Sequence, residues 1–119
     1  MDRPLELMFH NMDPSSEIDA RVRMRVKKLE EIYQHIIGCR VAIDLEIIRH
    51  SSGETPDVHI NIQVPDQEVI VSRHHNRGES ASTTIDHAFD AAEFQLKEYK
   101  ARKMGRTKHH AAASEVVKR

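Results

Sequence analysis

Apolar and polar residues alternate in four stretches of the chain, and this period of two residues predicts β-strands that bury one face. The apolar positions are Leu5, Leu7 and Phe9 in the first stretch, Val41, Ile43, Leu45 and Ile47 in the second, Val58, Ile60, Ile62 and Val64 in the third, and Val69 and Val71 in the fourth. The segment from Pro65 to Glu68 is typical of a tight turn. We therefore expect the third and fourth strands to form a hairpin, with Pro65 opposite Glu68.

Two longer segments repeat apolar residues every three or four positions, which is the spacing of an amphipathic helix. The stripe comprises Ile18, Val22, Val26, Leu29, Tyr33 and Ile36 in the first segment, and Ile85, Ala88, Phe89, Ala92, Leu96 and Tyr99 in the second. The Ser15–Ser16 pair predicts the start of the first helix and Gly38 its end. The second helix is expected to start near Ser82, with Asp86 in its first turn, and to stop at Gly105.

The predicted order of elements is β-α-β-β-β-α. Strands and helices that are each apolar on one side favour an α+β fold, in which two side-by-side helices pack on one face of a four-stranded sheet. The length of 119 residues fits one domain. We assign it to residues 1–105 and expect residues 106–119 to form a flexible basic tail.

Several classes of protein are disfavoured by composition. No stretch approaches the 18 apolar residues of a membrane span, and the N-terminus lacks the apolar run of a secretory signal. The single cysteine, Cys39, excludes an internal disulfide and fits a reducing cytoplasm, and we expect it to pack near the core.

Positive charge is segregated, although the formal net charge is only -1. Of the 18 Lys and Arg residues, 11 lie in two short segments of the predicted helices: Arg21, Arg23, Arg25, Lys27 and Lys28, then Lys97, Lys100, Arg102, Lys103, Arg106 and Lys108. A charge run is usually a solvated helix face, and cations at a helix C-terminus also stabilise its dipole. No acidic residue stands within the flank formed by Arg21, Arg25 and Lys28, and unpaired cations predict an anionic partner such as a phosphate backbone.

Three stretches of this chain resemble the ribosome hibernation-promoting factor family, which includes ribosome-associated inhibitor and subunit interface proteins. They are PLELMFHNMDPSSEIDARVRMRVKKLEEIY, GCRVAIDLE and TIDHAFDAAEFQLKEYKAR, and the likeness spans residues 4–104. Within the last stretch, Asp86, Ala88, Phe89 and Asp90 match the start of the family's final helix. The chain departs from similar sequences at Glu93 and Phe94, where basic residues are common.

The resemblance implies a small, cytoplasmic, bacterial protein of the stress response with the same order of elements. Such proteins bind the small ribosomal subunit near its decoding centre, block the mRNA and tRNA sites, and keep idle ribosomes intact. By this likeness the main contacts with ribosomal RNA (rRNA) would be Arg21, Arg25, Lys28, Lys97, Lys100, Lys103 and Arg106. Secondary contacts would be Arg23, Lys27, Arg102 and Lys108. We expect recognition of the RNA backbone and shape, without a base code.

Histidine is unusually frequent, with nine residues. With Pro65 opposite Glu68, His59 would face His74 on the side of the sheet away from the helices, and His50 would lie diagonally nearby. Three imidazoles can bind a transition metal. An ordinary polar face is the simpler interpretation, because no carboxylate or cysteine completes the set, so we predict no metal and no cofactor.

The remaining hypotheses are a protein-interaction module and an enzyme. Phe94 lies opposite the apolar stripe of its helix, where it could stack on a base or seat a partner, including a second copy in a weak homodimer. The pair Asp86–His87 with Asp90 could be drawn as an acid and base, but the spacing also suits a helical turn. The four glycines are scattered, and no nucleophile elbow or HExxH motif is present. We therefore expect no catalytic residues and no small-molecule substrate.

Overall fold

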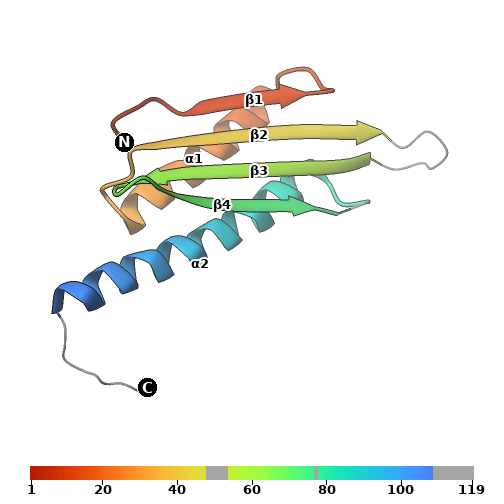
Figure 1. Cartoon of the computed structure of the whole chain (residues 1–119). Helices are drawn as coiled ribbons and strands as arrows, with labels where there is room; N and C mark the ends of the chain where they lie inside the picture. Colours follow the sequence, from red (N-terminus) through yellow and green to blue (C-terminus); the bar gives the residue numbers. More distant parts are fainter. Residues whose placement is uncertain (48–53, 77, 109–119) are drawn as a thin grey trace.

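The computed structural model describes residues 1–47, 54–76 and 78–108 (Figure 1). The elements are β1 (Glu6–His10), α1 (Ser16–Ile32), β2 (Gly38–Ile47), β3 (Glu54–Val64), β4 (Glu68–His75) and α2 (Ala81–Lys108). This is the predicted order, and the α+β fold is confirmed. None of the helices in the described part of the chain is long and apolar enough to cross a membrane.

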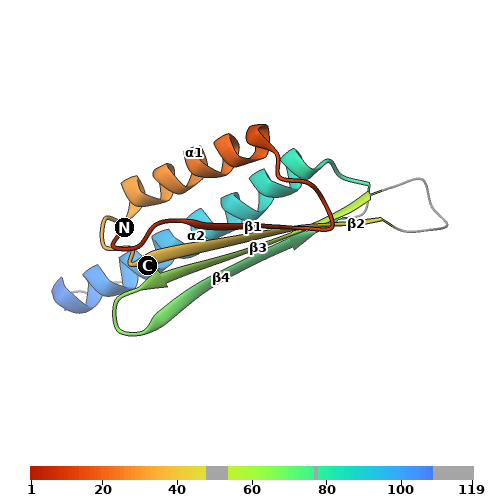
Figure 2. The same ribbon diagram turned by 90° about the horizontal axis from the view of Figure 1, so that it is seen from above.

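The four strands form one mixed sheet in the order β1-β2-β3-β4. β1 pairs with β2 in parallel, while β2–β3 and β3–β4 are antiparallel neighbours. A parallel pair needs a crossover connection, and α1 supplies it between β1 and β2. Figure 2 shows α1 and α2 lying together on one side of the sheet, as the one-sided apolar patterns predict.

The core lies between this sheet face and the two helices. All six residues of the second predicted stripe are buried, and Val22, Val26 and Leu29 of the first are buried with them. Cys39 joins this core, and burial raises the pKa of its thiol to about 12. Ser72 is the polar exception on β4, and its hydroxyl donates to the Ala88 carbonyl at 2.8 Å, so the buried group is satisfied.

The first helix starts where the serine pair predicts but ends earlier than expected. Ser15 is the N-cap, with its hydroxyl accepting from the Ile18 amide at 3.2 Å. The helix stops at Ile32, followed by an extended Tyr33. The prediction that Gly38 ends this helix is wrong, because Gly38 begins β2. Ile36 is still buried, from the connection rather than from the helix.

The second helix is longer than predicted. It starts at Ala81, where the Ser80 hydroxyl accepts from the Thr83 amide at 3.2 Å, and Asp86 therefore lies beyond the first turn. It passes through Gly105 to Lys108, so the predicted stop is wrong. One glycine costs a helix only about 1 kcal/mol, which does not end it. The predicted tail thus begins inside this helix, and residues 109–119 lie outside the described part of the chain.

The register of the last hairpin differs from the prediction by one residue. Val64 pairs with Glu68, so the loop holds three residues, and Asp66 and Gln67 adopt positive φ angles of 69° and 61°. A slip of one residue exchanges the two faces of a strand. Val69 and Val71 are consequently exposed, at 52% each.

The same slip separates the two histidines that we expected to meet. His59 pairs with Arg73, and His74 pairs with Val58. His59 keeps its place on the outer face, but His74 turns to the side of the helices. His50 lies outside the described residues. The cluster of three imidazoles, which we considered as an alternative to an ordinary polar face, therefore has no support.

Candidate nucleic-acid interface

The two helices run side by side in the same direction and are joined by ion pairs. Arg21 lies 3.0 Å from Asp86 near the start of both helices. Further along, the Lys100 ammonium donates to the Ile32 carbonyl at 3.1 Å, where α1 ends. The flank of α1 that carries the predicted basic stripe therefore faces α2.

Arg25 is the centre of this seam between the helices. Its guanidinium lies 3.2 Å from Asp86, 2.8 Å from Asp90 and 3.0 Å from Glu93. The side chain is only 11% exposed, and its guanidinium lies over the Phe89 ring at 5.5 Å. Burial alone would lower the pKa of Arg25, but hydrogen bonds and charge from Asp90 and Glu93 outweigh it, and the pKa is raised.

These contacts correct the premise that the basic flank lacks acidic partners. The acids come from α2, 61 to 68 residues further along the chain, and not from within α1. Asp86 and Asp90, considered above as a possible acid and base with His87, both contact Arg25. Lys28 belongs to the same seam only weakly, at 4.0 Å from Glu93 and with 60% exposure.

The other predicted cations differ in whether they form ion pairs with carboxylates of the protein. Arg23 is exposed and pairs with Asp19, one turn earlier in α1. Lys103 contacts the acids of the β3–β4 turn, Asp66 and Glu68, and lies over the Tyr99 ring. Lys27, Lys97 and Arg102 are exposed and make no ion pair with any residue that the structure describes. Arg106 and Lys108 fall within α2, but their side chains are not among those described.

Five exposed cations lie in the C-terminal halves of the two helices. Acidic Asp86, Asp90 and Glu93 come first along α2, and Lys97 and Lys100 follow on the same flank. Figure 1 shows that the last turns of α2 extend beyond the end of the sheet. We call Lys27, Lys28, Lys97, Lys100 and Arg102 the C-terminal basic surface.

A hollow lies beside this surface, between the ends of the two helices. Its lining includes Tyr33, His35, Lys100 and Lys103. The Tyr33 ring packs edge-on against both His35 and Tyr99, with ring centroids 5.5 and 5.4 Å apart. Burial raises the pKa of the Tyr99 hydroxyl to about 12. Cations next to aromatic rings are a common surface for single-stranded or looped RNA.

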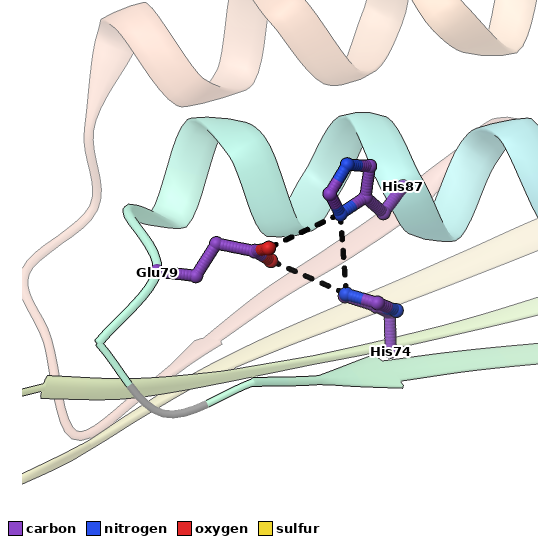
Figure 3. Close-up of side chains that lie close together, drawn as sticks. All are labelled: His74, Glu79 and His87. Carbon is purple, nitrogen blue, oxygen red and sulfur yellow. Dashed lines mark hydrogen bonds and ion pairs between the residues drawn. The ribbon is translucent and has the colours of Figure 1, made fainter.

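A second group of residues escaped the sequence analysis. His74, Glu79 and His87 come together at the opposite end of α2 (Figure 3). Burial alone would raise the pKa of Glu79, but the Thr84 hydrogen bond and the two imidazoles outweigh it, and the pKa lies below its ordinary value. The correct hairpin register would have been the signal, because it turns His74 toward α2.

The chain is similar in sequence to one known protein family. The family model described as sigma 54 modulation protein / S30EA ribosomal protein matches residues 5–104. The chain belongs to this family. The resemblance inferred from the three sequence stretches is thereby confirmed, and the chain falls among ribosome-associated proteins. No curated protein sequence matches the chain significantly.

Two solved structures share the fold. A ribosomal subunit interface protein from Coxiella burnetii superposes with a TM-score of 0.67 at 16% identity, over 82% of this chain and 97% of that one. The N-terminal domain of Protein Y from Thermus thermophilus gives a TM-score of 0.61, also at 16% identity, over 79% of this chain and 94% of that one. At this identity the likeness supports the arrangement of strands and helices alone.

Proposed function

We propose that this protein binds rRNA of the small ribosomal subunit near the decoding centre, and there blocks the mRNA and tRNA sites. Family membership over residues 5–104 supports association with the ribosome. The observation that carries the proposal to RNA is the C-terminal basic surface. Its Lys27, Lys97, Lys100 and Arg102 form no ion pair with any described residue, and its Lys28 has only the long contact of 4.0 Å with Glu93. Idle ribosomes held in this way would be kept intact and inactive in the cytoplasm.

We assign the predicted contact residues to two roles, RNA contact and stabilisation of the fold. Lys27, Lys28, Lys97, Lys100 and Arg102 are the proposed main contacts, with Arg23 beside them. Arg106 and Lys108, further along α2, remain proposed contacts on the sequence alone. Arg21 and Arg25 are assigned the role of holding the two helices together, and Lys103 that of tying α2 to the β3–β4 turn, because each has carboxylate partners.

Salt dependence is the physical signature of such a surface. Each phosphate that a cation neutralises releases counterions. The logarithm of the binding constant therefore falls linearly with the logarithm of the salt concentration. If each of the five proposed main contacts neutralises one phosphate, log K should fall by roughly four units for each tenfold rise in salt. An apolar interface would not show this slope.

The test is co-sedimentation of purified protein with small ribosomal subunits over a series of salt concentrations. We expect K97E/K100E to lose most of its binding at low salt. The matched control is R3E/R40E, which makes the same change in charge at exposed residues distant in the fold, Arg40 lying on β2. If K97E/K100E sediments like the unmodified chain at every salt concentration, the C-terminal basic surface is not the RNA-binding site.

The alternative is a protein-interaction module that acts as a weak homodimer through Phe94. The observation that favours it is the exposure of this ring, 63% on α2. It predicts self-association that persists in high salt and is lost in F94A, as measured by light scattering after gel filtration. Monomers at all concentrations, together with salt-sensitive ribosome binding, would exclude it.

A further inference from the structure

Three side chains from separate parts of the chain meet at the N-terminal end of α2. His74 comes from the end of β4, Glu79 from the connection that follows, and His87 from α2. Figure 3 shows the two imidazoles and the carboxylate directed toward one another. None of the three belongs to the C-terminal basic surface, and the proposed function does not use them.

We propose that His74, Glu79 and His87 form a binding site for a divalent transition-metal ion of the zinc type. The His74 Nε2 and His87 Nδ1 atoms lie 3.3 Å apart. Each lies 3.2 Å from an oxygen of Glu79. The two contacts are to different oxygens, Oε1 for His74 and Oε2 for His87. Ligands at 2.0–2.1 Å from a tetrahedral ion are separated by roughly 3.3 Å, so the two nitrogens already have the spacing of two such ligands. One ligand atom from each of the three residues lies within 4.8 Å of the other two, so a small turn of the carboxylate completes the set.

The carboxylate is held in place independently of any ion. Its side chain is only 12% exposed. The Thr84 hydroxyl donates to one oxygen at 2.8 Å, and the Asn76 amide donates to the other at 3.2 Å. Outer hydrogen bonds of this kind orient metal ligands and raise affinity. The site is therefore ordered before an ion arrives.

The donor set indicates the class of ion. Two imidazole nitrogens and one carboxylate suit zinc and its neighbours, whereas magnesium and calcium prefer oxygen ligands throughout. His87 is 48% exposed and His74 32%, so an ion can enter from solvent. Three protein ligands leave a fourth position for water or an external ligand. An ion here would tie the end of β4 to α2.

The experiment titrates zinc chloride into the full chain by calorimetry and uses Co²⁺ absorption to report coordination. We expect one equivalent with a four-coordinate cobalt spectrum, and a rise in melting temperature on adding zinc. H74A and H87A should each weaken binding by more than the roughly 10–100-fold that loss of an outer partner causes. E79Q is a further variant that keeps the side-chain volume, but it removes the charge and replaces one acceptor oxygen by an NH2 donor, so it should also weaken zinc binding.

The matched controls are H59A and H75A. His75 is exposed and His59 is half-buried on the outer face of the sheet. Neither belongs to the cluster, so their variants should bind zinc as the unmodified chain does. Melting of each variant in EDTA checks that it is folded. Binding that is absent, that shows a six-coordinate cobalt spectrum, or that survives in H74A and H87A would overturn the site, the last by assigning the ion to other histidines.

Discussion

Replacing Arg25 by methionine tests whether the helix–helix seam stabilises the fold. Methionine keeps an apolar stem over Phe89 but lacks the positive charge that pairs with three carboxylates. The most affected partner is Glu93, which is 12% exposed. Of its ion pairs with described residues, it would keep the one with Lys28, 4.0 Å away.

The magnitude follows from the exposure of each partner. A hydrogen bond between charged groups at a site as buried as Glu93 contributes about 1.5–3 kcal/mol. Asp86 and Asp90 are 37% and 66% exposed, so their pairs contribute about 0.2–1 kcal/mol each. The buried Arg25 Nε has no hydrogen-bond partner among the residues that the structure describes, and removing this unsatisfied group returns about 1 kcal/mol. The net loss is about 1–4 kcal/mol, or roughly 4–16 °C in melting temperature for a domain of this size.

Urea denaturation followed by circular dichroism measures this loss. The matched control is R23M, which breaks only the exposed pair with Asp19 and should cost about 0.3–0.5 kcal/mol. The double variant R25M/E93Q should recover part of the stability, because it removes the unpaired carboxylate with its partner. Equal free energies of unfolding for R25M and R23M would refute the reasoning. So would a stable R25M that has lost ribosome binding.

Three further predictions concern single residues. Burial would raise the pKa of Asp57, but the Arg73 hydrogen bonds and charge outweigh it and hold the pKa below its ordinary value. D57N should therefore reduce the free energy of unfolding near neutral pH. This difference should vanish as pH falls through the lowered pKa, and urea denaturation at several pH values measures it. G105A should raise stability by about 0.5–1 kcal/mol, because Gly105 is helical and an added Cβ would meet nothing within 4 Å. Cys39, buried and with a pKa of about 12, should resist a thiol reagent at pH 8 in the folded protein and react rapidly in urea.

Local periodicity predicted the elements, while their ends depended on contacts that a linear pattern does not contain. The apolar stripe of α2 is buried as expected from Ile85 to Tyr99. Gly38 and Gly105 are typical stop signals, yet one lies in a strand and the other in a helix. Helix ends are set by tertiary packing as much as by single residues.

The charge pattern shows the same limit at the candidate site. Within α1, Asp19 stands one turn before Arg23, so the sequence could have predicted their pair, although we did not predict it. The sequence does not reveal that Asp90 and Glu93 lie against Arg25 until the two helices are placed side by side. The His74 cluster was missed for a related reason, because one extra residue in the hairpin loop decides which face carries the imidazole.

Hydroxyl-radical footprinting of small-subunit rRNA, with and without the protein at low salt, tests the central claim most directly. We predict protection of the RNA backbone around the decoding centre, its loss in K97E/K100E, and its retention in R3E/R40E. Protection confined to another region of the subunit would contradict the proposed block of the mRNA and tRNA sites. No protection at all, with the protein folded, would contradict RNA binding itself.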